Sequence, residues 1–261
     1  MANGIMNIVA AQTMRSASDI AIYYAYHQFV KRDRVLIACM PKSGSTFLSN
    51  AVSRLPGFRK VSLIGSFTGR SDKEINFPKA LRKYRYNYSC QQHVKYNENT
   101  AAAIEAFGIT PVVLVHNIFD CVLSIRDHLR REAVESPVAY FLPEHPSLPD
   151  DELESAIVRL AIPWYIHFYV SWTHCPNATW VTYEEATQNT AAAIEKILRN
   201  SHRRFDRATI EKAVNAANPE KDRKNVGRAG RGASLSEENK DIIRRYRSFY
   251  PNIDFSPIGL D

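Results

Sequence analysis

The sequence has few cysteines, no metal-ligand spacing and no long uninterrupted apolar run. Its four cysteines among 261 residues show no C-x-x-C pattern, so we interpret them as free thiols in a reducing compartment and predict no metal site. The N-terminus lacks a charged region followed by an apolar run, which argues against a signal peptide and favours a cytoplasmic protein. The most apolar stretch, residues 156–172, contains Arg159 and His167 and is therefore interpreted as a buried helix.

Positive charge is concentrated in the C-terminal third. The chain has a formal net charge of +7, and residues 196–250 contain fifteen basic and seven acidic side chains. Such a surplus favours an anionic partner, which leaves a phosphorylated ligand or peripheral contact with an acidic membrane open. The segment has neither a pattern of stacking aromatics nor a zinc spacing, so no nucleic acid is expected as a partner.

Short apolar runs alternate with segments of helical periodicity. Strands are predicted at 34–40, 61–67, 88–95, 111–116 and 179–183, and the helices at 46–54, 99–107, 119–132, 150–172, 184–199, 207–217 and 236–250. This alternation predicts a P-loop-like α/β fold, with a mostly parallel central sheet flanked by helices in a single domain at 34–261. A further helix at 17–31 is expected in an N-terminal segment, residues 1–33, that packs on the domain.

The stretch "MPKSGSTFL" follows the first predicted strand and opens a helix. Free backbone N–H groups at a helix N-terminus, with the helix dipole, form a site for anions. Gly44 lets the backbone approach a phosphate closely, and Lys42 adds a positive charge. The hydroxyls of Ser43, Ser45 and Thr46 add further donors. An ordinary strand–turn–helix with Ser45 as its cap is the simpler alternative.

A second polar segment, "HNIFDCVLS", follows the strand "PVVLVH". His116 and Ser124 lie at its two ends, and together they are candidates to hold a second anion at the same edge of the sheet. Capping and a surface ion pair are the alternative interpretation of this helix start.

Four segments resemble, in order, the motifs of sulfotransferases that use 3′-phosphoadenosine 5′-phosphosulfate. "MPKSGSTFL" resembles the family's phosphosulfate loop, P-K-[ST]-G-[ST]-[ST]-[WF]-L, and "HNIFDCVLS" resembles its 3′-phosphate segment, R-[ND]-P-x-D-x-x-x-S. "VTYEEA" is similar to a strand end of the family, and "RKNVGRAGRGASLSEEN" to its late basic glycine loop. The chain departs from the pattern at His116, where the family has arginine, at Ile118, where it has proline, and at Asn225, where glycine is usual.

The resemblance implies transfer of a sulfuryl group from 3′-phosphoadenosine 5′-phosphosulfate to a hydroxyl or amine, without a metal, leaving adenosine 3′,5′-bisphosphate. Lys42 would then stabilise the leaving phosphate. The implied donor-binding residues are Lys42, Ser43, Gly44, Ser45, Thr46, Phe47, His116, Ser124, Arg223, Arg228, Gly230 and Arg231.

An acceptor hydroxyl also needs a general base. His93, in "SCQQHVKYN", follows a predicted strand between the two anion sites and is the candidate, in keeping with the histidine that many members of the family use in this region. A structural or surface role is the alternative for a lone histidine. The acceptor is expected to be a small molecule, a carbohydrate or a lipid-linked alcohol.

Two other functions remain open. A P-loop nucleotide kinase or hydrolase would have the order G-K-[ST] and an acidic residue closing a strand for magnesium; here Lys42 precedes Gly44, and "VVLVH" ends without an acid. A protein that binds the donor without catalysing transfer is the other possibility, because His116 replaces an arginine.

Overall fold

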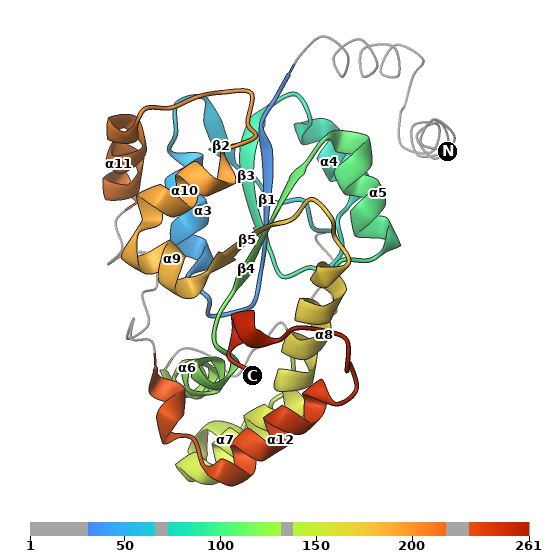
Figure 1. Ribbon diagram of the computed structural model, residues 1–261, viewed down its shortest axis with the longest axis vertical. Coiled ribbons are helices and arrows are strands. Elements are labelled where there is room, and N and C mark those ends of the chain that lie inside the picture. Colours follow the sequence, from blue (N-terminus) through green and yellow to red (C-terminus); the bar gives the residue numbers. More distant parts are fainter. Residues whose placement is uncertain (1–30, 66–72, 132–137, 218–229, 261) are drawn as a thin grey trace.

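A five-stranded parallel sheet forms the centre of the molecule (Figure 1). The computed structural model describes residues 31–65, 73–131, 138–217 and 230–260, and all statements below concern these residues. The strands are β1 (Arg34–Cys39), β2 (Phe58–Lys60), β3 (Asn87–Gln92), β4 (Thr110–Val115) and β5 (Thr179–Thr182), in the spatial order β2-β3-β1-β4-β5. Every neighbouring pair is parallel, which confirms the predicted α/β architecture.

The central strand β1 shows why both faces of the sheet carry helices. All six of its residues are buried, and successive side chains of a strand point to opposite faces. Val35, Ile37 and Cys39 pack into one apolar core, whereas Leu36 and Ala38 pack into the other. A continuous apolar run is therefore what this position in the sheet requires.

The helices divide between these two cores and one end of the sheet, as Figure 1 shows. One face carries α3 (Ser45–Ser53), α9 (Tyr183–Gln188), α10 (Thr190–Ile197) and α11 (Arg207–Ala216), and the other carries α4 (Phe77–Lys83) and α5 (Glu98–Phe107). Beyond the carboxyl ends of the strands lie α6 (Ile118–Arg131), α7 (Asp150–Leu160), α8 (Ile162–Thr173) and α12 (Glu237–Arg247). The 3₁₀ turns are η1 (His145–Ser147), η2 (Arg231–Ser234) and η3 (Ser256–Ile258).

Two of the predicted helices are each broken in two. The helix expected at 150–172 ends at Leu160 and restarts at Ile162, because Pro163 has no N–H to donate and its ring collides with the carbonyl of the preceding turn. The helix expected at 184–199 is interrupted at Asn189, which has an extended φ of −140° and caps α10 by accepting from the Ala192 amide. Both breaks are local effects of a single residue.

The strand predicted at 61–67 was wrong in position. The chain pairs with β3 earlier, over Phe58–Lys60. Ile64 forms only an isolated antiparallel bridge with Ile75. The chain has therefore already left the parallel sheet at the position where the apolar pattern predicted a strand.

The predicted N-terminal helix at 17–31 falls almost wholly outside the described residues, and the domain boundary after residue 33 stays a prediction. Among the helices that the structure describes, none combines the length and the apolarity that crossing a membrane requires.

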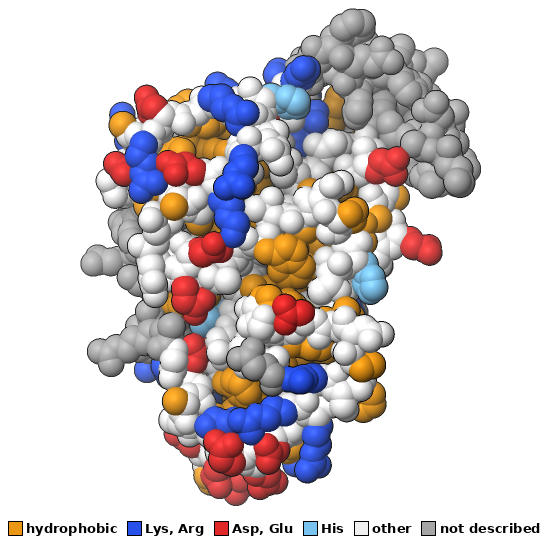
Figure 2. Space-filling model, in the orientation of Figure 1, with side chains coloured by type: hydrophobic (Ala, Val, Ile, Leu, Met, Phe, Trp, Pro, Cys, Tyr) orange, Lys and Arg blue, Asp and Glu red, His pale blue; other side chains and the backbone are white. Residues whose placement is uncertain are grey.

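The basic C-terminal third does not form one uniform positive surface. Lys196, Arg207, Lys240 and Arg244 each form ion pairs with glutamate or aspartate side chains. Figure 2 shows basic and acidic side chains interleaved on the face that it presents. Within the described part of the chain, much of the positive charge seen in the sequence is thus locally neutralised.

Candidate active site

The loop between β1 and α3 has the backbone of an anion cradle. Lys42 and Gly44 both have left-handed conformations, with φ values of 64° and 75°. A side chain at such a φ costs about 1–2 kcal/mol, and strain of this kind persists where the surroundings enforce it. Gly44 occupies the N-cap position of α3 and no side chain caps the helix, so the first amides of α3 keep their N–H groups for a ligand.

The three hydroxyls of the loop have different roles. Ser43 is fully buried and donates its hydroxyl hydrogen to the Met40 carbonyl over 2.6 Å, so it shapes the turn. Ser45 is buried and forms a side-chain hydrogen bond with Cys39. Thr46 and the Phe47 ring are half-buried on the first turn of α3. The loop is also supported from α8, where the Tyr165 hydroxyl donates to the Pro41 carbonyl over 3.1 Å.

His93 lies against the end of β1, next to the same loop. It follows β3, which pairs with β1, and its Nδ1 is 2.8 Å from the Cys39 carbonyl oxygen. A carbonyl can only accept, so Nδ1 carries the hydrogen and Nε2 carries a free lone pair. The fold thus fixes the tautomer in which Nε2 can accept a proton.

The sequence predicted that Cys39 is an ordinary free thiol. In the structure its sulfur has three polar neighbours beside the anion cradle. Its Sγ lies 3.4 Å from Nδ1 of His93 and accepts a hydrogen bond from the side-chain Nε2 of Gln91 over 3.3 Å, and the Ser45 side chain forms a further hydrogen bond with it. Burial alone raises the pKa of the thiol, but these three groups outweigh it and hold the pKa of Cys39 below its usual value. The N-terminus of α3 nearby favours negative charge on the sulfur in the same sense.

The same contact acts on the imidazole. Burial by itself lowers the pKa of His93, but the negative charge and hydrogen bonds of Cys39 more than compensate and raise the pKa above its usual value. The side chain after β3 and the last residue of β1 therefore form a coupled pair beside the anion cradle.

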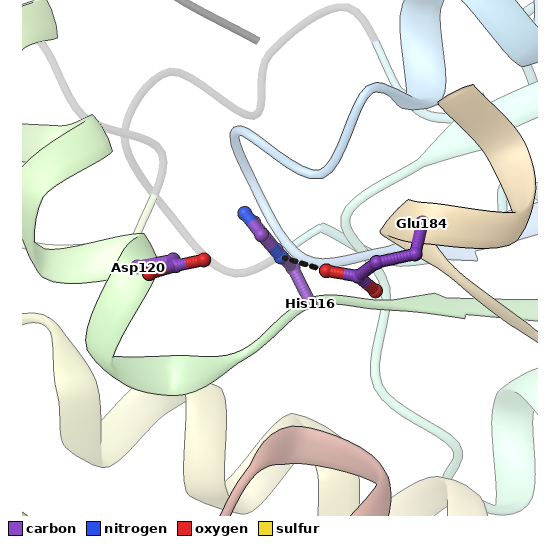
Figure 3. A group of neighbouring side chains, drawn as sticks. All are labelled: His116, Asp120 and Glu184. Atoms are coloured by element: carbon purple, nitrogen blue, oxygen red, sulfur yellow. Dashed lines mark ion pairs between the residues drawn. The ribbon is translucent and has the colours of Figure 1, made fainter. Parts of the chain in front are cut away.

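The second predicted anion site lies at the end of β4 (Figure 3). His116 is 4% exposed and its ring stacks on Tyr183, with 4.0 Å between the ring centroids. Its Nδ1 is 3.7 Å from a carboxylate oxygen of Glu184. Burial lowers the pKa of His116, although Glu184 and Asp120 oppose that shift. Ser124, predicted as its partner, is buried in the second turn of α6.

The described part of the late glycine loop, which begins at Gly230, docks on α6. The two carboxylate oxygens of Asp120 accept the amides of Gly230 and Gly232 over 2.8 and 2.5 Å. Arg231 binds Asp127 over 2.7 Å. These contacts hold Gly230 and Arg231 against α6, which follows His116 in the chain, and their role in donor binding stays a prediction. Arg223 and Arg228, which were predicted with them, lie outside the described residues.

Arg126 does not supply the positive charge that His116 lacks. Its guanidinium binds Glu154 over 2.7 Å, Asp150 over 3.1 Å and Asp127 over 3.3 Å. These three acids hold it between α6 and α7, and they leave its charge neutralised.

His116, Asp120 and Glu184 bring possible metal-ligand atoms within 4.8 Å of one another. Asp120, however, already accepts a backbone amide at each oxygen. In Figure 3 the imidazole lies between the two carboxylates, which approach it from opposite sides. The arrangement is that of a histidine flanked by two acids, rather than of three ligands facing one centre.

No family model matches the chain, and no curated protein matches it in sequence. Solved structures do match its fold. Mouse sulfotransferase SULT7A1 complexed with PAP matches with a TM-score of 0.61 at 13% identity, over 84% of this chain and 85% of that one. The chain has the fold of the sulfotransferases. Retinol dehydratase matches that fold too: with androsterone and the inactive cofactor PAP bound, its TM-score is 0.53 at 14% identity over 88% of each chain. With retinol and PAP bound, the TM-score is 0.54 at 12% identity, over 89% of this chain and 85% of that one.

The site contains residues that the sequence patterns had left aside. Tyr183 was not among the predicted site residues, yet its ring stacks on His116 and lies 3.4 Å from the position of a Cβ added to Gly44. Its place directly after β5 was the available signal, because carboxyl ends of parallel strands meet at one edge. Cys39 carried no such signal, since its role depends on the register between β1 and β3.

Proposed function

We propose that the protein is a sulfotransferase that moves the sulfuryl group of 3′-phosphoadenosine 5′-phosphosulfate to an acceptor hydroxyl or amine. The observation that supports this most directly is the 2.8 Å hydrogen bond from His93 Nδ1 to the carbonyl of Cys39. It joins the candidate base to the strand that leads into the Lys42 loop, in a fold shared with structures that contain PAP. Donor loop and base then serve one reaction centre.

The Lys42 loop is proposed to hold the 5′-phosphosulfate. The first amides of α3 and the helix dipole stabilise the phosphate charge, and the Lys42 ammonium neutralises the charge that develops as the bond from sulfur to the phosphate oxygen breaks. Ser43 acts indirectly, because its hydroxyl is used to shape the turn. Adenosine 3′,5′-bisphosphate is the leaving product.

His93 is proposed as the general base. The acceptor oxygen attacks sulfur in line with the leaving phosphate oxygen, and its proton passes to Nε2 of His93. The carbonyl of Cys39 keeps Nδ1 protonated, and the Cys39 sulfur stabilises the imidazolium that results. The chemistry needs the neutral histidine before transfer and the charged one after it.

The 3′-phosphate is proposed to lie beside His116, Ser124 and the docked late loop. His116 takes the place of an arginine with two donor groups, and it faces Glu184. A buried neutral imidazole contributes less to phosphate binding than a guanidinium, so we expect His116 to hold the 3′-phosphate less tightly than an arginine would. The cytoplasmic location stays a prediction.

The test is transfer of labelled sulfate from the donor to a panel of hydroxyl and amine acceptors, with release of adenosine 3′,5′-bisphosphate as the second readout. We expect transfer to fall at least about hundredfold in Lys42→Ala and His93→Ala, in line with the loss of one stabilising or proton-accepting group. The exposed Lys212 and His202 provide matched controls, and Lys212→Ala and His202→Ala should keep full activity.

The alternatives predict different results. Phosphate transfer or hydrolysis with ATP and magnesium would point to a kinase or hydrolase and overturn the proposal. Tight binding of adenosine 3′,5′-bisphosphate without transfer to any acceptor or to water would identify a donor-binding protein without catalysis.

A further inference from the structure

The amino ends of the strands carry a group of basic side chains, at the end of the sheet opposite the Lys42 loop. Arg32 precedes β1, Arg59 lies on β2, Lys83 ends α4, Arg85 precedes β3, and Arg203 lies between α10 and α11. We call these five residues the amino-end patch. In Figure 2, Lys and Arg side chains gather along this upper end of the molecule, whereas acidic side chains gather at the opposite tip.

Hydrogen bonds hold the separate segments of the patch in one surface. Arg32 Nε donates to the Arg85 carbonyl over 3.0 Å. The next residue, Asp33, accepts the backbone amide of Arg203 over 3.1 Å. The Arg203 guanidinium in turn lies against Gly57, at the start of β2. Chain segments that are far apart in the sequence therefore present their charges side by side.

Two guanidinium groups of the patch share one aromatic ring. The guanidinium carbons of Arg59 and Arg85 lie 4.2 and 4.9 Å from the ring centroid of Tyr86. The hydrogen bond with the Arg85 side chain lowers the pKa of the Tyr86 hydroxyl, and the charges of Arg85, Arg59 and Lys83 lower it further. Two guanidinium groups at one ring repel each other, so an anion beside the ring is attracted by both.

No ion pair in the described part of the chain involves any of these five residues. Arg32 donates to carbonyl oxygens, while Arg59, Arg85 and Arg203 are exposed and lie over aromatic rings. The nearby carboxylate of Asp33 is 4% exposed and accepts backbone amides. The patch therefore keeps its positive charge for a partner outside the chain.

The aromatic rings of the patch disfavour a nucleic acid as that partner. Proteins that bind single strands offer exposed aromatic faces on which bases stack. Here Tyr86 and Phe205 are only half-buried, but guanidinium groups lie over their rings: Arg59 and Arg85 over Tyr86, and Arg203 over Phe205 at 5.6 Å. These rings serve to hold arginines.

The sequence that leads into the patch favours a lipid surface. Residues 20–30, IAIYYAYHQFV, contain three tyrosines and no Lys, Arg, Asp or Glu, and Lys31 and Arg32 follow directly. Tyrosine is enriched at the interface between membrane and water. Basic clusters next to apolar and aromatic sequence are typical of proteins that bind acidic membranes, because the two attractions add.

We propose that the amino-end patch binds the surface of a membrane that contains acidic phospholipids. Its guanidinium and ammonium groups attract the lipid phosphates and carboxylates, and each contributes about fivefold to the affinity for an acidic membrane. The proposal is independent of the sulfotransferase function, because the Lys42 loop lies at the other end of the strands (Figure 1).

Sedimentation of the full chain with lipid vesicles tests the proposal. Vesicles of phosphatidylcholine alone are compared with vesicles that also contain phosphatidylserine. The chain should bind the phosphatidylserine vesicles at least about tenfold more strongly, and this difference should shrink as salt is raised.

Variants locate the surface. The double variant Arg59→Gln with Arg85→Gln should bind phosphatidylserine vesicles about twenty- to thirtyfold more weakly, at about fivefold for each charge. The matched control is Arg245→Gln with Arg247→Gln, which removes the same charge from exposed positions at the end of α12. The control should bind as the parent chain does. An unchanged Tm in calorimetry shows that each variant is folded.

Three results would overturn the inference. Equal binding to the two kinds of vesicle would show that acidic lipid is not recognised. An equal loss in the patch variant and in the control would show that only net charge matters. Binding of a short DNA duplex that displaces the vesicles, and that is lost in the patch variant, would identify a nucleic-acid surface instead. None of these results bears on donor binding at Lys42.

Discussion

Replacing Asp120 by asparagine should detach the late glycine loop from α6. The carboxylate is 3% exposed, and its two oxygens accept the amides of Gly230 and Gly232. Asparagine has the same shape, but its NH₂ group must face one of these amides, so one hydrogen bond is lost and two donors meet. Loss of a charge-assisted bond, with a buried donor left unpaired, costs about 3 kcal/mol.

Differential scanning calorimetry and amide hydrogen exchange measure this loss. A destabilisation of about 3 kcal/mol lowers the Tm of a chain of this size by about 6–12 °C. If the loop detaches by itself, the fall in Tm is smaller, and the amides of Gly230 and Gly232 exchange faster instead. In either case we expect weaker binding of adenosine 3′,5′-bisphosphate, because the loop no longer faces His116.

The matched control is Asp151→Asn, at the exposed first turn of α7. It should change stability only by the few tenths of a kcal/mol that a carboxylate contributes near a helix N-terminus. An Asp120→Asn protein with the parent's Tm, exchange rates and nucleotide affinity would refute the assigned role of Asp120.

Three further substitutions test other parts of the site. Cys39→Ser removes the sulfur that raises the pKa of His93. Since the base must be neutral to accept a proton, the acid limb of the pH profile of kcat/KM should move to lower pH. An unmoved acid limb would refute the coupling between Cys39 and His93. Gly44→Ala forces a side chain to a φ of 75° at about 1–2 kcal/mol, so donor affinity should fall in a folded protein, as titration calorimetry would detect. Gly232→Ala places a Cβ 2.9 Å from the Asp120 amide nitrogen, and should expose the late loop to proteolysis, which Ala233→Gly should not.

The sequence predicted β1 and β4 well because all but one of their residues are buried. The apolar run that became β4 has no other stable place than the interior of a parallel sheet, and its predicted bounds were one residue from those observed. Local patterns could not position β2, because only three of its residues pair and two of them are exposed. Pairing with β3 is a long-range effect that no short window records.

In the candidate site, too, the local features could be predicted from the sequence and the long-range contacts could not. The Lys42 loop was predictable, since strand, loop and helix are contiguous and their chemistry is local. The coupling of Cys39 to His93 was not, because it joins residues 54 positions apart through the register of two strands. The docking of Gly230 and Gly232 on Asp120 spans more than a hundred residues, and only the folded chain brings the two together.

The central claim is that the Lys42 loop binds the donor of sulfuryl transfer. Titration calorimetry of adenosine 3′,5′-bisphosphate into the parent chain and into Lys42→Ala, beside ATP with magnesium, tests it most directly. We predict saturable binding of adenosine 3′,5′-bisphosphate to the parent chain, at least about tenfold weaker binding to Lys42→Ala, and no comparable binding of ATP with magnesium. Preference for ATP with magnesium, or equal affinity of the parent chain and Lys42→Ala for adenosine 3′,5′-bisphosphate, would contradict the claim.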